Sequence, residues 1–356
     1  MTVDKVRSVV VVMAEPNRAF RSTARTVIGH LQEGQLAGRC RSLEARDHLG
    51  SVALETIADQ PDYPIKNAEE ALLEELALTP PLALVAMDPL AGVLVGRWAE
   101  QLDDPLTIGM VGSLWLDPLW HHARLDRLIV PDQSIARSLH AEGRDSDQLV
   151  PIGLGVCGRF GIGVREGRQD CRRTLKLPPD QPVLLMVTET LWADDVPKWL
   201  ETTADLDRRI TLLVDAAGDR LALQQARRTH ERLGLDGKVF GRADDAGLYW
   251  GAADRVVGRA LDGLVTRALA FRCPMWAIRP ADDRQRGIVA GLEKLGAGSP
   301  ILDPRSLAAA LREPGWEAPL DAGRLETMAG ASVPQRIAEA ITQMAIEREA
   351  AVSRKT

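Results

Sequence analysis

The chain has 356 residues, of which 45% are hydrophobic and 26% are charged, and its formal net charge is −6. This length is sufficient for two domains with separate cores, because a single core seldom grows beyond roughly 250 to 300 residues. The acidic balance gives no electrostatic basis for nucleic-acid binding by the chain as a whole. No apolar run reaches the roughly 18 residues of a membrane helix and no secretory cleavage pattern follows the N-terminus, so we expect a cytoplasmic protein.

Metal and disulfide chemistry find little support in the sequence. No CxxC pair occurs, no histidine lies at metal-ligand spacing, and the four cysteines are widely separated: Cys40, Cys157, Cys171 and Cys273. Such spacing is typical of buried or idle thiols and not of a zinc site or a disulfide framework. We therefore expect free thiols, no metal and no cofactor.

The first half of the chain alternates between apolar strands and amphipathic helices. Residues 9–13 form a continuous β-branched run, which is typical of a strand buried on both faces of a parallel sheet. A helix with one apolar face is predicted at 21–33. Further strands are predicted at 82–87, 106–111, 125–130 and 148–152, with helices at 68–78, 93–101 and 133–142. This alternation predicts a Rossmann-like domain over residues 1–160.

A Gly-rich, charged segment at 161–170 marks the predicted domain boundary, and a second α/β series follows it. Strands are predicted at 183–188, 210–214, 239–240, 255–257 and 275–279, with helices at 196–206, 221–233, 246–252, 265–271, 285–295 and 306–311. The amphipathic stretch 334–351 predicts a helix that packs on a domain. The sequence thus predicts an α/β protein with two Rossmann-like domains, 1–160 and 161–330, a C-terminal helix within 331–356, and a ligand cleft at the strand ends.

Several ordered segments of the chain resemble one enzyme family. They are TPPLALVAMDPLAGVLVGRWAEQ at 79–101, DPLWHHARLDRLIVPDQSIARSLHAEG at 117–143, PIGLGVCGRF at 151–160 and KVFGRADDAGLYWGAADRVVGRALDGLVTRALAFRCP at 238–274. In these segments the chain is similar to the diacylglycerol galactosyltransferases (monogalactosyldiacylglycerol synthases) and, more distantly, to the lipid-linked peptidoglycan GlcNAc-transferase. The resemblance implies the GT-B fold, with an acceptor-type N-terminal domain, a donor-type C-terminal domain and transfer of a sugar from a UDP-sugar.

The residues on the acceptor side depart from the family pattern. The family's Gly-rich first loop, which ends in a His able to act as a base, corresponds here to EPNRAF and places Phe20 at the position of that His. A family His before Pro corresponds to Asp88, which is either a base or a turn former, and a later His corresponds to Asp117. If catalysis survives, the candidate bases are Asp88, Asp117 and Glu15.

The residues on the donor side depart from it as well. The family's first glycine loop corresponds to 188–190, where Glu189 would repel a phosphate. Its Gly-Gly-x-Thr diphosphate loop corresponds to 261–264, and its ribose-binding Glu corresponds to Arg267, which has no acceptor. Guanidinium groups bind phosphate bidentately and could replace the lost backbone donors. The candidate donor- or phosphate-binding residues are therefore Arg259, Asp262, Gly263, Arg267 and Arg284.

The joint change of these motifs beside a retained framework favours a GT-B pseudoenzyme, which binds a protein partner or a changed, phosphorylated ligand. One alternative is an active glycosyltransferase that moves a sugar from a nucleotide-sugar donor to a lipid or small-molecule acceptor. Another is a different sugar-nucleotide enzyme on this scaffold, such as an epimerase or a hydrolase. With a lipid acceptor, the apolar loop at 114–120 would offer a peripheral membrane contact. No nucleic-acid partner is expected in any of these cases.

Overall fold

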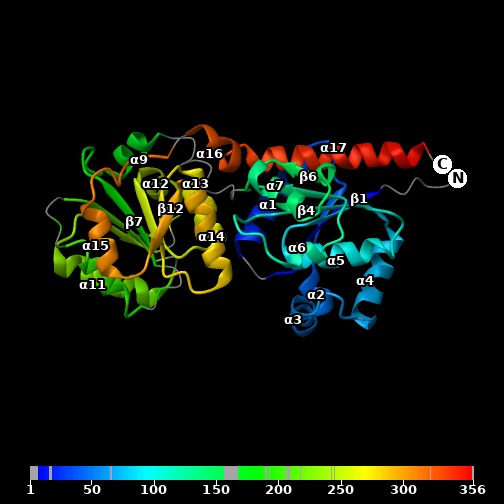
Figure 1. The fold of residues 1–356 in the computed structure, drawn as a ribbon, viewed down its shortest axis with the longest axis horizontal. Coiled ribbons are helices and arrows are strands. Elements are labelled where there is room, and N and C mark those ends of the chain that lie inside the picture. The colour runs from blue at the N-terminus through cyan, green and yellow to red at the C-terminus, as the bar shows by residue number, and fades with distance from the viewer. Residues whose placement is uncertain are drawn as a thin grey trace. The chain divides into compact units, whose positions relative to one another are not determined.

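The chain folds into two compact units, which a computed structural model describes over residues 7–15, 18–64, 66–155, 167–188, 191, 193–204, 206, 209–216, 218–241, 243, 245–320 and 322–354. Unit 1 comprises Met1–Cys157 and Ser332–Thr356, and unit 2 comprises Gly158–Ala331. Each unit contains a six-stranded sheet in which all the neighbouring strands are parallel, with helices packed against it (Figure 1). The predicted fold class, two Rossmann-like α/β domains, is confirmed.

Unit 1 has the strand order β2-β1-β3-β4-β5-β6. Its strands are β1 (Ser8–Met13), β2 (Cys40–Glu44), β3 (Pro81–Ala86), β4 (Leu106–Met110), β5 (Arg127–Val130) and β6 (Leu149–Pro151). Its helices are α1 (Arg18–Glu33), α2 (Ala45–Leu49), α3 (Ser51–Asp59), α4 (Lys66–Leu78), α5 (Pro89–Ala99), α6 (Leu119–His122), α7 (Gln133–Ala141), the 3-10 turn η1 (Ser146–Gln148) and α17 (Val333–Ser353).

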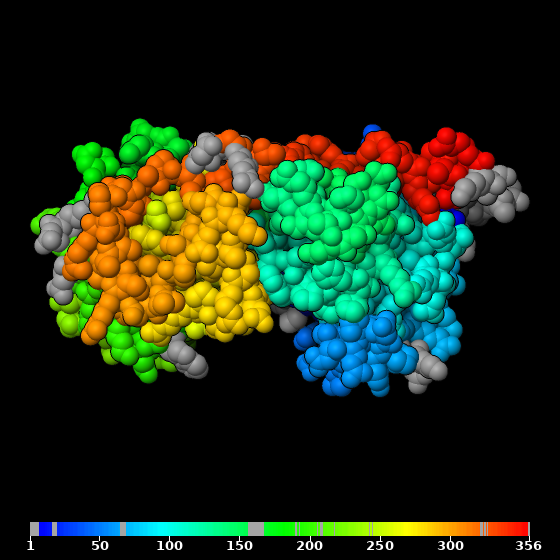
Figure 2. All heavy atoms as spheres, viewed as in Figure 1, coloured from blue at the N-terminus to red at the C-terminus, as the bar shows by residue number. Residues whose placement is uncertain are grey.

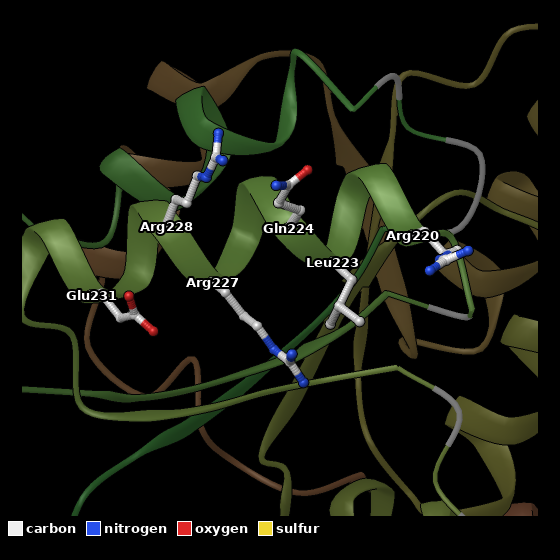
Figure 3. Close-up of a pocket in the computed structure, with 6 residues that line it drawn as sticks. All are labelled: Arg220, Leu223, Gln224, Arg227, Arg228 and Glu231. Carbon is white, nitrogen blue, oxygen red and sulfur yellow. The ribbon is translucent and has the colours of Figure 1, made fainter.

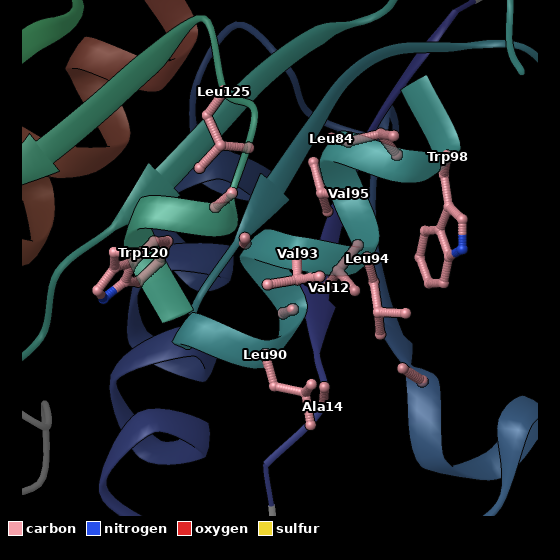
Figure 4. Close-up of a cluster of buried hydrophobic side chains, with 14 of the residues drawn as sticks. Val12, Ala14, Leu84, Leu90, Val93, Leu94, Val95, Trp98, Trp120 and Leu125 are labelled. Atoms are coloured by element: carbon pink, nitrogen blue, oxygen red, sulfur yellow. The ribbon is translucent and has the colours of Figure 1, made fainter. Parts of the chain in front are cut away.

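The central strands of unit 1 divide their side chains between two cores. Val10 and Val12 of β1 face one core and Val9 and Val11 face the other, because successive residues of a strand point to opposite faces. All four valines are fully buried, which explains why this run is continuously apolar and does not alternate with polar residues. Figure 4 shows the first core, where Val12 lies beside the apolar face of α5.

Trp120 belongs to this core and is only 2% exposed. A Cβ atom added to Gly92 or to Gly109 would lie 2.7 Å from its indole ring, so glycine at both positions lets the ring pack between α5 and β4. The indole is therefore a packing element and not an exposed sugar platform. Leu116 and Leu119 also pack against the core, so apolar residues of the 114–120 loop point inward.

The helix α17 completes the second core of unit 1. It contributes Val333, Ile337, Ile341 and Ala345, whose spacing of four residues places them on one face. At its far end Glu349 forms a two-pronged ion pair with Arg39, with Nη2 2.6 Å from Oε1 and Nη1 3.3 Å from Oε2. The predicted terminal helix thus packs on the unit that contains the N-terminal half of the chain.

The segment between β2 and β3 was not predicted in detail. It contains the short helices α2 and α3 before α4, and these helices stand out from unit 1 as a lobe, coloured blue in Figure 2. The strand β2 has the sequence CRSLE, in which Leu43 is the one fully buried side chain. It lies at the sheet edge, so it needs no continuous apolar run.

Unit 2 has the strand order β12-β11-β10-β7-β8-β9. Its strands are β7 (Val183–Val187), β8 (Thr211–Asp215), β9 (Gly237–Phe240), β10 (Arg255–Gly258), β11 (Met275–Ile278) and β12 (Gly298–Ile301). Its helices are α9 (Arg168–Leu175), α10 (Val196–Glu201), α11 (Arg220–Leu233), α12 (Ala246–Ala252), α13 (Asp262–Ala270), α14 (Asp283–Lys294), α15 (Pro304–Arg312) and α16 (Ala322–Ala329). The strand β12, GSPI, was missed because it is short and contains Gly and Pro.

A buried carboxylate ties the start of the unit 2 sheet to α9. Asp254 accepts from the backbone N–H of Val183 at 2.7 Å and from Nη2 of Arg172 at 2.6 Å, and both charged side chains are less than 9% exposed. Arg172 also donates from Nε to the carbonyl of Ala252 at 3.0 Å. The pair is therefore desolvated and hydrogen-bonded, which is the condition for a buried ion pair to be tolerated.

Membrane helices, metal ligands and cysteines complete the description of the fold. No helix within the described residues is long and apolar enough to cross a membrane. No group of three or more metal-ligating side chains occurs in that part of the chain. Cys40, Cys171 and Cys273 are free thiols, and burial raises the pKa of Cys273 to about 12, whereas Cys157 lies outside the described residues.

Candidate functional site

The strand order of each sheet identifies the edge at which a ligand is expected. In unit 1 β1 lies between β2 and β3, and in unit 2 β7 lies between β8 and β10. In each sheet, strands are therefore added first on one side of this strand and then on its other side, so the order of the strands reverses there. Parallel α/β sheets bind ligands beyond the carboxyl ends of the strands at such a reversal. Asp88 follows β3 at this edge of unit 1, and Arg259 follows β10 at this edge of unit 2.

Asp88 joins the two loops that leave the unit 1 sheet at its reversal. Its Oδ1 accepts from the backbone N–H of Ala91 at 2.8 Å and caps α5, which begins with Pro89. Its Oδ2 accepts from Ala14 at 2.8 Å and from Glu15 at 3.3 Å, just beyond the end of β1. The side chain is 1% exposed, and burial raises the pKa of this carboxyl although its three backbone hydrogen bonds oppose the shift. Its geometry is that of a structural connector.

The other acceptor-side positions are also taken up by local structure. Oδ1 of Asp117 accepts from the backbone N–H of Leu119 at 3.0 Å and so helps to start α6. Phe20 is 4% exposed, and its ring lies against Gly112, where an added Cβ would come within 3.1 Å of it. An apolar ring therefore fills the space beside the end of β4. Of the three candidate bases, the structure brings Asp88 and Glu15 together through the backbone of Glu15.

Two of the donor-side candidates form an ion pair at the start of α13. Asp262 is the first residue of this helix and is 6% exposed. Arg284, the second residue of α14, donates from Nε at 3.1 Å and from Nη2 at 2.7 Å to Oδ2 of Asp262. The N-terminus of a helix attracts negative charge, and here the protein's own carboxylate supplies that charge.

Two buried polar atoms near this pair have no partner among the described residues. Oδ1 of Asp262 accepts no hydrogen bond from that part of the chain, and Nε of Arg259, three residues earlier, donates none to it. Each such group costs roughly 1–3 kcal/mol of desolvation, so the local arrangement is not optimal for stability alone. Suboptimal polar packing of this kind is common where a functional site is or has been present.

Arg267 and Gly263 do not join this pair. Nε of Arg267 donates to the carbonyl of Gly263 at 2.7 Å, and its guanidinium lies 5.1 Å from the ring centroid of Trp250. These contacts place the guanidinium over the indole ring of α12. Sequence reasoning placed Arg259, Arg267 and Arg284 in one phosphate-binding cluster, whereas in the structure Arg284 contacts Asp262 and Arg267 contacts Trp250.

Two further positions are Gln285 and Glu189. Gln285, the third residue of α14, is 7% exposed and donates from Nε2 to Oδ2 of Asp282 at 3.1 Å. It also receives the backbone N–H of Ala281 on Oε1 at 3.3 Å, so its amide serves the α14 cap. Glu189, predicted to repel a phosphate, lies outside the described residues.

Sequence reasoning treated Asp262 and Arg284 as separate candidates and missed that they neutralise each other. A signal was present, because opposite charges stand at the starts of two helices that follow adjacent parallel strands, β10 and β11. Such helices both begin at the carboxyl edge of the sheet, which brings their first residues close together. The carboxylate of Asp262 therefore already occupies the guanidinium of Arg284, which a phosphate would otherwise bind.

No protein-family model and no curated protein sequence matches the chain, but its fold matches many solved structures. MurG from Acinetobacter baumannii has a TM-score of 0.67 and 14% identity, over 94% of this chain and 99% of that one. The chain has a GT-B fold. Sucrose-phosphate synthase from Thermosynechococcus elongatus has a TM-score of 0.59 and 15% identity, over 95% and 99%. UDP-GlcNAc 2-epimerase from Neisseria meningitidis, bound to UDP-GlcNAc, has a TM-score of 0.58 and 10% identity, over 94% and 100%. At sequence identities of 10–15%, the similarity to these structures shows a shared fold alone.

Proposed function

We propose that this chain is a GT-B protein of the monogalactosyldiacylglycerol-synthase type that has lost nucleotide-sugar binding and acts as a binding or partner subunit. The observation that carries the proposal is the Asp262–Arg284 ion pair at the start of α13. It stands where the family's diphosphate loop would offer backbone amides and a hydroxyl group. An internal anion there takes the place of a ligand phosphate.

The cost of displacing this pair is large compared with nucleotide affinity. A phosphate that recruited Arg284 would leave the carboxylate of Asp262, 6% exposed, without its partner. Removing one partner from a buried ion pair costs about 3–5 kcal/mol. Micromolar binding corresponds to about 8 kcal/mol, so this cost weakens a nucleotide by roughly a thousandfold, to the millimolar range.

The acceptor side supports the same proposal. Phe20 fills the position of the family's His with an apolar ring, and Asp88 uses both oxygens to hold backbone N–H groups. A general base must reach the proton that it removes and must carry a lone pair directed toward it. Neither side chain offers that arrangement, so loss on the donor side is matched by loss on the acceptor side.

Isothermal titration calorimetry of the full chain with UDP, UDP-glucose, UDP-galactose and UDP-GlcNAc tests the proposal. We expect no binding heat at ligand concentrations up to roughly 1 mM, because of the displacement cost given above. Micromolar affinity for any of these ligands would overturn the proposed function. The Asp262→Gly variant provides a matched arm, because it removes the internal anion and retains Arg284.

An active glycosyltransferase is the second candidate, and the unpartnered Nε of Arg259 favours it. That atom could donate to a donor phosphate, with transfer to a lipid or small-molecule acceptor and Glu15, Asp88 or Asp117 as base. Release of UDP from a UDP-sugar in the presence of diacylglycerol vesicles would distinguish it from the binding subunit. Another sugar-nucleotide enzyme would instead convert the UDP-sugar without an acceptor.

A further inference from the structure

The helix α11 carries an exposed basic face in a chain whose net charge is −6. Its buried side consists of Ala222, Ala226 and Thr229, which pack toward the sheet of unit 2. On the exposed side, Arg220, Arg227 and Arg228 form no ion pair or hydrogen bond with the described residues. Exposed arginines that the described residues leave unpaired are suited to an anionic partner.

The shape of this face determines which kind of anion fits it. A hollow of about 250 Å³ on α11 is lined by Arg220, Leu223, Gln224, Arg227, Arg228 and Glu231. Figure 3 shows the guanidinium groups of Arg227 and Arg228 extending to opposite sides of the helix. They do not converge on one small anion. An acidic helix lying along one side of α11 would instead meet Arg228.

The chain itself contains an element with the complementary character. On α4, Glu70, Glu74 and Glu75 are exposed, and Glu75 shares its charge with Arg41 through a 3.0 Å ion pair. Each of the two helices also exposes one leucine at an end. Leu78, the last residue of α4, is 71% exposed, and Leu221, the second residue of α11, is 65% exposed.

We propose that α4 of a second copy of the chain docks antiparallel on α11. This rests on the proposed function, because it identifies the partner of the binding subunit as another copy of the same chain. With Leu221 opposite Leu78, Arg228 lies about 10.5 Å along α11 from the leucine contact. Glu74 and Glu70 lie about 6 Å and 12 Å from it along α4, so Arg228 falls between two carboxylates. The apolar contact sets the register and the charges set the orientation.

Other anionic partners fit this face less well. On α11 Leu221 is exposed and Leu223, which lines the hollow, is half-buried, whereas a helix that lies in a membrane interface needs a wide apolar face. A nucleic acid would be contacted by few cations on this face, and the carboxylate of Glu231, which lies beside them, would repel its phosphates. A contact between two single helices is small, so the association is weak and sensitive to salt.

Sedimentation velocity of the full chain measures this association directly. We expect the weight-average mass to rise above the monomer value of 38.8 kDa between roughly 5 and 200 µM protein at about 50 mM salt. At about 500 mM salt the association constant should fall at least tenfold. A mass that remains monomeric at low salt, or an association strengthened by salt, would overturn the proposal.

Charge-reversal variants test the register. Arg227→Glu/Arg228→Glu and, separately, Glu70→Arg/Glu74→Arg should each be monomeric. An equimolar mixture should associate, because each variant then meets a helix of opposite charge on the other. Arg25→Glu/Arg137→Glu, which changes the net charge as Arg227→Glu/Arg228→Glu does but at exposed positions of α1 and α7, should associate as the unmodified chain does.

The mixture and the control variant test the α4–α11 contact, and vesicle binding tests whether the anion is a lipid. The contact is refuted if the mixture remains monomeric. It is also refuted if the control variant becomes monomeric. Binding of Arg227 and Arg228 to anionic phosphatidylglycerol vesicles by a chain that remains monomeric would likewise refute it in favour of a lipid surface. These outcomes are independent of nucleotide calorimetry, so failure of this proposal is distinguishable from failure of the proposed function.

Discussion

Removal of the Asp88 carboxylate separates its structural role from a catalytic one. The Asp88→Ala substitution eliminates the α5 cap to Ala91 and the hydrogen bonds from Ala14 and Glu15. Loss of a cap costs about 1 kcal/mol, and a buried N–H left without a partner costs about 1–3 kcal/mol. The Ala14 bond is buried and 2.8 Å long, whereas the Glu15 bond is 3.3 Å long and part-buried, so one full orphan penalty applies. We expect a loss of about 3 kcal/mol.

Asp132 provides the matched control in the same unit. It also follows a strand, caps α7, and accepts from Ser134 at 2.9 Å and from Ile135 at 3.1 Å. These two backbone bonds are those of an ordinary cap, and their loss in Asp132→Ala should cost about 1 kcal/mol. For a unit of this size each kcal/mol lowers the melting temperature by about 2–4 °C. Thermal melting followed by circular dichroism should therefore show a loss for Asp88→Ala about three times that for Asp132→Ala.

Equal losses of melting temperature in the two variants would refute the reasoning, because the bonds to Ala14 and Glu15 would then contribute nothing. A variant Asp88→Ala that melts like the unmodified chain but loses a measured glycosyl transfer would instead assign Asp88 to catalysis. Asp88→Asn adds an internal check. It keeps the side-chain size but converts one acceptor oxygen to a donor group, so it should remain less stable than the unmodified chain.

Three further predictions concern unit 2. Asp262→Gly removes the internal anion from α13 and should make UDP binding at least tenfold tighter than in the unmodified chain, within the range that calorimetry detects. If neither the variant nor the unmodified chain binds UDP, the displacement cost is contradicted. Burial lowers the pKa of His230, against the opposing effects of neighbouring acidic groups, so the folded state disfavours its protonation. The stability that this residue contributes is therefore present above roughly pH 6.5 and is lost as the pH falls below that value. Between pH 7 and pH 5, urea denaturation should show a smaller loss of unfolding free energy for His230→Gln than for the unmodified chain. Arg172→Ala leaves Asp254 buried without this partner and should cost about 3 kcal/mol of unfolding free energy in urea, whereas Arg124→Ala, at an exposed pair, should change it by less than about 0.5 kcal/mol.

Local pattern was sufficient for most of the sheet strands and for several helices, although some helices begin earlier than predicted. Val9 to Val12 are continuously apolar because this strand is covered on both faces, and the sequence carries that information within four residues. The Asp88-Pro89 pair combines a cap with a residue suited to the first helical turn, and α5 begins there, four residues before the start predicted at 93. By contrast, β2 and β12 lie at sheet edges, where strands need no continuous apolar run.

The sequence by itself therefore determined the α/β class, the two Rossmann-like sheets and the positions at which the chain departs from the pattern of the family that it resembles. Only the tertiary structure decided what those changed residues do. Asp88 contacts a backbone N–H 74 positions earlier in the chain, and Asp262 pairs with an arginine 22 positions later. Periodicity and capping depend on neighbours within a few residues, whereas these contacts depend on which strands lie side by side in a sheet. For that reason the residues around Asp262 were recognisable from the sequence as a candidate phosphate site, and only the fold revealed that Arg284 already pairs with its carboxylate.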